Sequence, residues 1–409
     1  MHVTRLRALL LGASIFIPLL IPLGAGAVGT GAPLSLHDLV EQAWQRSSHG
    51  RSQTSRTAEA EATRALSSSW IAGQPVLGLS QRSDRLGSDR GLSESEVSVA
   101  ASLWTPSQRA ARRTFAEQAS REVQAQARKS RLDIAGQVRA RLWDAAAAQA
   151  LLEEKQGHLD HTSQLADEVK RRVAAGDLAR VDGLLAEQEV LAGKVAVEQA
   201  KAEVRHSASR LTILTGYSGP LPLVPESLPG AQALANPLLL AARAAEHRAR
   251  AALQLAQASR RAPPTVTLSM RRERTFATAE PDRSLGVALQ FPLGGAARNR
   301  PAEAQAQTQV AIANAEAEQA ESAAQAELDV ARTTLENART ALDAARARVA
   351  AMTEHHRLTE RAFKLGERGL SDLLRSTALA HEAEVAERQQ EIALARAHAQ
   401  LNQASGVLP

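Results

Sequence analysis

Apolar residues recur at every seventh position along two long segments of the chain. In residues 296–365 large apolar side chains and alanines occupy the two positions of this repeat, and residues 105–175 have the same spacing. The positions are Leu328, Leu335, Leu342 and Val349 with Ala324, Ala331, Ala338 and Ala345, and, in the earlier segment, Val138, Ala145, Leu152, Leu159, Ala166 and Val173. A seven-residue apolar repeat is typical of helices that coil around one another. About 70 residues at ~1.5 Å each predict helices about 100 Å long.

A shorter helical segment follows each long one. Residues 178–214 and 370–404 are again rich in Ala, Glu, Gln and Arg, which favour helices, and a glycine-containing turn precedes each of them. We therefore expect each long helix to be followed by an antiparallel return helix. An ordinary helical bundle would explain the apolar repeat equally well, but it would not explain the strand signals that lie between the helices.

Two regions show strand periodicity instead. Leu285, Val287, Leu289 and Phe291 alternate with small or polar residues, which is the period of a strand with one apolar face. Polar turn residues divide each region into two strands, so each is expected to form a hairpin. The predicted hairpins cover about 75–103 and 264–291.

These elements occur twice because the chain is a tandem duplication. Gly176 and Asp182 return 190 residues later as Gly366 and Asp372. The first strand repeats at an offset of 189 (75–80 against 264–269), and Val99-Ala100 repeats as Val287-Ala288 at 188. The repeats are predicted at 28–219 and 227–409, with the proline-rich segment 220–226 as linker.

The N-terminus predicts export from the cytoplasm. Arg5 and Arg7 precede an apolar run at 8–23, and Ala25-Gly26-Ala27 then offers the small-residue pattern of a cleavage site. Residues 1–27 are therefore interpreted as a signal peptide. A transmembrane anchor fits less well, because the run is short and contains two prolines. No later apolar run reaches the ~18 residues of a membrane helix, so a membrane role would require strands.

Composition narrows the class of function. Only 2% of the residues are aromatic and 44% are apolar, so the core must be built from Ala, Leu and Val. The net charge of +5 would be compatible with binding to nucleic acid. Charges of both signs are interleaved as on solvated helices, however, so no nucleic-acid partner is predicted. The chain has no cysteine, which excludes disulfides, thiolate metal sites and an N-terminal lipidated cysteine.

Four strands raise a closure problem, because they cannot form a barrel and open sheet edges cannot lie in lipid. Three copies would supply twelve strands, enough for a closed barrel with a water-filled interior. Trp70, Trp104, Phe276 and Phe291 lie at strand ends, where membrane-interface aromatics belong. The predicted fold class is mainly α with a small β part: a duplicated coiled-coil tube with four strands per chain in a trimeric barrel.

The chain resembles the TolC-like outer-membrane efflux proteins. Each repeat of that family begins with a short amphipathic helix, here 34–44, followed by Asn-Pro; the second repeat has Asn236-Pro237, whereas the first has Ser48-His49 at that place. The segment 287–295 is similar to the family's strand exit, with alternating apolar residues, Pro-Leu and Gly. The resemblance implies a homotrimer in the outer membrane with a periplasmic helical tube, a periplasmic adaptor and an inner-membrane pump of the RND or ABC type.

The resemblance also points to the turns at the far end of the long helices. Similar turns in the family meet the adaptor, and an arginine two residues after the second glycine belongs to the network that closes the tube. The docking residues so implied are Gly176, Asp177, Leu178, Gly366, Glu367, Gly369 and Leu370, and the gate residues are Arg368, Asp182 and Asp372. Alternatively, the glycines only cap helices and the charged residues are solvated. Arg368 and Gly369 are expected to have no counterparts in the first turn.

No enzyme, cofactor or metal site is predicted. The sequence has no nucleophile elbow, phosphate loop or zinc signature, and the pairs His158/His161 and His355/His356 lack a third ligand. The expected function is a passive exit duct for small molecules or metal ions. The run 298–301 resembles the heavy-metal efflux branch of the TolC-like family more than its protein-secretion branch, and a type I protein-secretion duct is the alternative. A periplasmic adaptor would need a compact β domain, and a purely structural coiled coil would be soluble.

Overall fold

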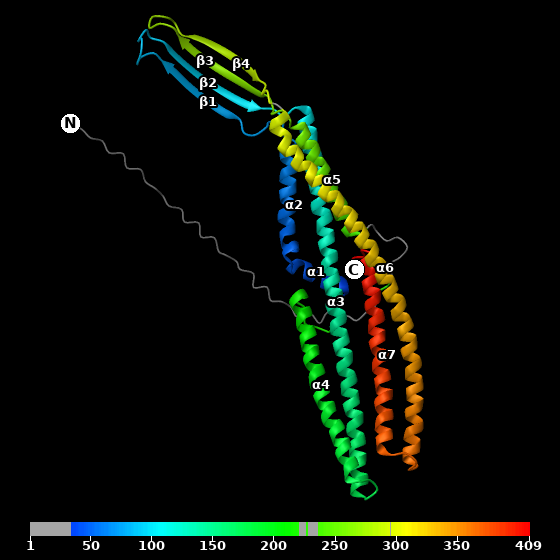
Figure 1. The fold of residues 1–409 in the computed structure, drawn as a ribbon. Coiled ribbons are helices and arrows are strands. Elements are labelled where there is room, and N and C mark those ends of the chain that lie inside the picture. Colours follow the sequence, from blue (N-terminus) through cyan, green and yellow to red (C-terminus); the bar gives the residue numbers. More distant parts are fainter. Residues whose placement is uncertain (1–33, 221–225, 228–235, 295) are drawn as a thin grey trace, which may run out of the picture. The chain divides into compact units, whose positions relative to one another are not determined.

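The computed structural model describes residues 34–220, 226–227, 236–294 and 296–409. The predicted signal peptide and most of the linker 220–226 lie outside the described residues. From α2 in the first repeat and α5 in the second, the two repeats have the same order of elements (Figure 1). The first contains α1 (Leu36–Arg46), α2 (Ser48–Ser67), β1 (Val76–Ser83), β2 (Ser93–Ser102), α3 (Pro106–Ala174) and α4 (Arg180–Thr215). The second contains α5 (Pro237–Ala258), β3 (Thr265–Arg274), β4 (Asp282–Gln290), α6 (Ala296–Lys364) and α7 (Leu370–Ala404).

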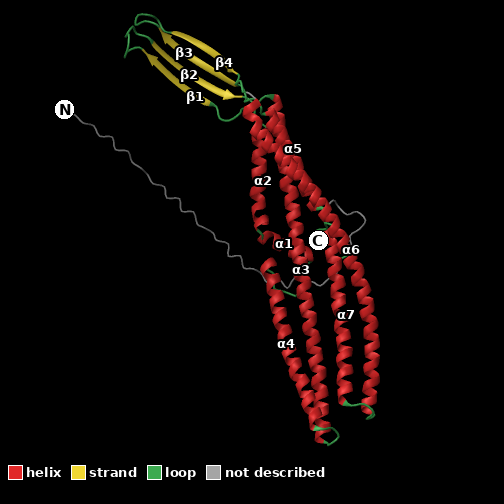
Figure 2. Ribbon diagram, in the orientation of Figure 1, coloured by secondary structure: helices red, strands yellow, loops and turns green. Residues whose placement is uncertain are grey.

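The two long helices, α3 and α6, organise the helical part. Each has 69 residues. Along α3, the shorter helices α2 and α4 follow one another, and α5 and α7 pack between α3 and α6 (Figures 1 and 2). The predicted return helices are confirmed. None of the described helices combines the length and apolar character needed to cross a membrane.

Small residues dominate the helical core, as the composition predicts. The alanines of the seven-residue repeat in α6 are buried together with Leu335 and Leu342, and Val138 and Ala145 are buried in α3. The largest apolar cluster forms where α1 packs against α3 and α4, around Leu39 and Leu211. Alanines allow helix axes to approach closely, so this chain reaches dense packing with few large side chains.

The strands form one antiparallel sheet in the order β1-β2-β3-β4. The two predicted hairpins are present, and β2 pairs with β3 to join the two repeats. Leu79 pairs with Val97, Val99 with Leu268, and Leu268 with Val287. The edge strands β1 and β4 each have one partner among the described strands.

This register corrects one sequence alignment. Leu79 corresponds to Leu268, and the residues paired with them are Val97 and Val287. Val287 therefore corresponds to Val97, at an offset of 190, and not to Val99. A two-residue slip along a strand keeps every side chain on its face, so the apolar alternation cannot distinguish the two alignments.

The start of α2 gives a second correction. Ser47 caps α2, and its hydroxyl accepts a hydrogen bond from the backbone N–H of Gly50; Asn236 caps α5, and its side chain accepts one from Leu238. The counterpart of Asn236-Pro237 is therefore Ser47-Ser48, one residue earlier than Ser48-His49. Serine and asparagine both cap helices well, so the first repeat retains the capping function without the Asn-Pro pair.

Candidate functional site

The two turns at the far end of the long helices have the same backbone. Each contains five residues, 175–179 and 365–369. Gly176 and Gly366 have φ of 84° and 77°, a conformation that favours glycine. The next N–H, of Asp177 or Glu367, donates to the carbonyl five residues earlier at 2.9 Å. Both glycines thus end a helix in the same hydrogen-bonded motif.

The equal lengths overturn the expectation that Arg368 and Gly369 have no counterparts. Leu178 occupies the place of Arg368, and Ala179 occupies the place of Gly369. Ala179 directly precedes α4, and Gly369 directly precedes α7. The asymmetry lies in the side chains alone. Leu178 packs against the apolar cluster beneath the turns, whereas the Arg368 side chain is 63% exposed.

Of the three predicted gate residues, Arg368 and Asp372 form an ion pair within one chain, and Asp182 bonds elsewhere. Arg368 Nη1 lies 3.6 Å from Asp372 Oδ2, and both side chains are exposed. Asp182 accepts a hydrogen bond from the backbone N–H of Ala179 at 3.2 Å. Asp182 and Asp372 occupy equivalent positions in the first turn of α4 and α7, where a carboxylate stabilises the helix.

An apolar cluster beneath the turns joins the two helical hairpins. It contains Val169 of α3, Ala186 of α4 and, from the second hairpin, Phe363, Leu370 and Leu373. The Arg172 guanidinium lies 4.9 Å from the centre of the Phe363 ring. Leu370 is only 3% exposed. It therefore supports the second turn from within, while Asp177, Glu367 and Gly369 are exposed.

Histidines gather on the same helices, further from the turns. His158 stacks on His381 with ring centres 4.4 Å apart, and His381 Nε2 lies 2.9 Å from Glu154 Oε1. His161 meets His356 edge to face. Burial, with the neighbouring His381 and Lys155, holds the pKa of His158 below its ordinary value. In the described part of the chain no three of the histidine, glutamate and aspartate side chains are arranged so that they could hold a metal ion.

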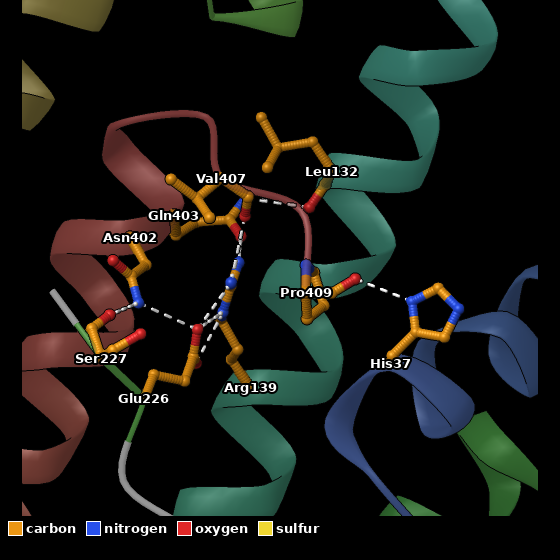
Figure 3. Close-up of polar contacts among 9 residues, drawn as sticks. All are labelled: His37, Leu132, Arg139, Glu226, Ser227, Asn402, Gln403, Val407 and Pro409. Carbon is orange, nitrogen blue, oxygen red and sulfur yellow. Dashed lines mark hydrogen bonds and ion pairs between the residues drawn. The ribbon is translucent and has the colours of Figure 1, made fainter. Parts of the chain in front are cut away.

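A charge pair between Arg139 and Glu226, which the sequence did not predict, lies at mid-length of α3 (Figure 3). Arg139 of α3 is 3% exposed, and its guanidinium binds the carboxylate of Glu226 through contacts of 2.8–3.2 Å. It also donates to Gln403 Oε1 at 2.7 Å and to the Val407 carbonyl at 3.0 Å. Asn402 donates to Glu226 at 3.1 Å. The network therefore joins α3, the segment that precedes α5, and the end of α7.

One sequence feature could have pointed to this network. Arg139 directly follows Val138, a buried residue of the seven-residue repeat in α3, so it would also be buried if a neighbouring helix packs against that part of α3. The partner could not be found from the pattern, because Glu226 lies 87 residues away in the linker and Gln403 lies 264 residues away.

Comparison with known proteins identifies this architecture. No family model and no curated protein matches the sequence. Among solved structures, the outer membrane protein VceC of Vibrio cholerae has a TM-score of 0.73 at 16% identity, covering 91% of this chain and 96% of its own. The open-state MtrE outer membrane channel of Neisseria gonorrhoeae has 0.71 at 19%, covering 91% and 89%. The CmeC outer membrane channel of Campylobacter jejuni has 0.70 at 12%, covering 91% and 85%. The chain therefore has the TolC-like fold of outer-membrane channel proteins.

Proposed function

We propose that this protein is the outer-membrane channel subunit of a tripartite efflux system. It would act as a passive exit duct for small molecules or metal ions, while an inner-membrane pump and a periplasmic adaptor supply energy and selection. The fold shared with solved outer-membrane channels supports this proposal. The observation that carries it is the sheet, which exposes one apolar face and two incompletely paired edges.

The two faces of the sheet differ in chemistry. One face carries the rows Leu79–Val97–Met270–Leu285 and Leu77–Val99–Leu268–Val287. These side chains are 47–83% exposed. The other face carries Gly78, Ser98, Ser269 and Gly286. An apolar face of this size in contact with water is unfavourable, whereas lipid outside and water inside satisfy both faces.

The edges indicate how copies associate. In a four-stranded meander β1 and β4 run in opposite directions, so β4 of one copy can continue the antiparallel pairing on β1 of the next. Such a head-to-tail contact closes into a ring. Three copies give twelve strands and leave no unpaired edge, which is the condition for strands in lipid. We therefore propose a homotrimer.

A stripe on α4 supports the same assembly. Val181, Leu184, Leu191 and Val195 follow each other at intervals of three, seven and four residues, so they lie on one face of the helix. All four are 56–67% exposed. This stripe has the spacing of a coiled-coil contact without a partner helix among the described residues, and we assign it to a helix of the neighbouring copy.

The turns at the tube end are the proposed adaptor contact. Gly176, Asp177, Leu178, Gly366, Glu367 and Gly369 would meet a helical hairpin of the adaptor, with Leu370 holding the second turn in shape. The paired glycines present backbone at two equivalent positions per chain, hence six per trimer. This supports a six-fold-like docking ring built from three identical chains.

Cell fractionation tests the proposed function. We expect the protein in the outer-membrane fraction, as a trimer on gels that dissociates on heating. A deletion strain should lose tolerance to metals or drugs. Recovery of the protein in the soluble periplasmic fraction would contradict the channel, and retention of secreted proteins without loss of tolerance would favour the protein-secretion alternative.

Removing the ion pair of the second turn is expected to open the tube. Arg368→Ala with Asp372→Ala should raise single-channel conductance in planar bilayers, because three copies of this pair would lie around the tube end. The matched control is Glu360→Ala with Lys364→Ala, which removes an exposed pair of the same spacing, 2.8 Å apart, just above the turn. Equal conductance of the two variants and the unmodified channel would remove Arg368 and Asp372 from the gate.

A further inference from the structure

Arginines are concentrated where the helices meet the sheet. Eight lie within about two turns of the helix ends nearest the strands: Arg64, Arg109, Arg112, Arg113, Arg260, Arg261, Arg298 and Arg300. We name them the arginine band. The only carboxylate in the segments 64–75, 103–113, 258–265 and 291–303 is Glu303. Hydrogen bonds from Arg260 and Asn299 lower the pKa of Glu303 to about 2, so it is charged and already paired.

Helix stability does not explain five of these eight cations. Arg109, Arg112 and Arg113 lie near the start of α3, and Arg298 and Arg300 near the start of α6. Positive charge is unfavourable at a helix N-terminus. Neither helix has an acidic residue in its first turn; α2 and α5 also lack one, whereas α1, α4 and α7 each have an aspartate there. The five arginines at the starts of α3 and α6 therefore lie where positive charge is unfavourable for the helix.

Two of the arginines stack on tryptophans at the base of the sheet. The Arg109 guanidinium lies 3.9 Å from the centre of the Trp70 ring and donates to the Ser68 carbonyl at 2.8 Å. The Arg112 guanidinium lies 3.5 Å from the Trp104 ring, and its Nε has no hydrogen-bond partner among the described residues. A guanidinium that stacks on a tryptophan still has N–H groups that point outward in its own plane, and these can donate to a phosphate.

We propose that the arginine band binds the phosphate groups of anionic phospholipids in the membrane leaflet that faces the periplasm. This inference rests on the proposed function. Strands of 8–10 residues match the span of the hydrocarbon core, so their base and the tryptophans would lie at its boundary. The arginines then fall within about 11 Å of that boundary along the helices, the depth at which headgroups lie.

Tryptophan quenching by brominated lipid tests the band in the full-length trimer. Trp44 and Trp143 are buried, so quenching reports on Trp70 and Trp104. Brominated phosphatidylglycerol in a phosphatidylcholine bilayer is expected to quench more than an equal fraction of brominated phosphatidylcholine. Each arginine near a membrane surface strengthens anionic-lipid binding up to about five-fold. The preference should therefore fall steeply in Arg113→Gln/Arg261→Gln/Arg298→Gln/Arg300→Gln, and also with added salt.

The control variant changes the same charge elsewhere: Arg205→Gln/Arg332→Gln/Arg339→Gln/Arg357→Gln, all exposed on the tube. It should keep the lipid preference. If the unmodified trimer inserts and conducts but the two lipids quench equally, the proposed lipid binding by the arginine band is wrong and the proposed channel function is unaffected. Failure to insert in either lipid would overturn the proposed function with it. If the band variant shifts ion selectivity and leaves the lipid preference unchanged, the arginines line the lumen and the lipid assignment is wrong.

Discussion

Arg139→Met is expected to lower the free energy of unfolding by about 3–5 kcal/mol, the largest stability loss that we predict for a single substitution. Methionine fills most of the volume but leaves the Glu226 carboxylate, whose side chain is 15% exposed, without its cation. It also removes the donors to Gln403 and to the Val407 carbonyl. Denaturant unfolding of the detergent-solubilised protein, followed by helical circular dichroism, measures the change.

Arg131→Met is the matched control. Arg131 lies two turns earlier on α3 and pairs with Glu41 at 3.1 Å, but both side chains are about 40% exposed. Exposed pairs contribute under about 1 kcal/mol. Adding Glu226→Leu to Arg139→Met should restore part of the stability, because the isolated charge is removed. Equal losses for the two arginine variants would show that the buried network contributes no more than a surface pair.

The sequence was sufficient for the long helices and their turns because those depend on local chemistry. The seven-residue repeat identified buried positions such as Ala338 and Leu342, and two glycines marked the turns. The side-chain environment of the turns required the structure. Leu178 and Arg368 occupy equivalent places, yet Leu178 packs against the apolar cluster beneath the turns and the Arg368 side chain is exposed.

Long-range partners were out of reach for a different reason. With 44 acidic residues in the chain, nothing in the pattern selects Glu226 as the partner of Arg139. The strand register was ambiguous because its alternation repeats every two residues. The histidines show the same limit: His158 and His161 were considered as a pair on one helix, but His158 stacks on His381 and His161 meets His356 edge to face.

The corrected strand register predicts which residues of neighbouring copies lie opposite each other, and therefore where an engineered disulfide would join two copies. In the duplication β3 corresponds to β1 and β2 to β4, so the contact of β2 with β3 should be repeated by β4 with β1 of the next copy. Val99 pairs with Leu268. Their counterparts are Leu289 and Leu79. We therefore expect Leu79 of one copy to lie opposite Leu289 of its neighbour in the barrel.

Leu79→Cys with Leu289→Cys should therefore convert the protein into covalent dimers and trimers on non-reducing gels. The native chain has no cysteine, so the bond can form only between the introduced residues. Within one chain β1 and β4 are separated by two strands, about 14 Å, which is too far for a disulfide. Leu79→Cys with Leu285→Cys is the control, because position 285 lies about 13 Å further along the same strand. Strong crosslinking of the control with none of the test pair would show that the repeats do not meet in equivalent register between copies; no crosslinking of either, in a protein that remains monomeric, would argue against the closed ring itself.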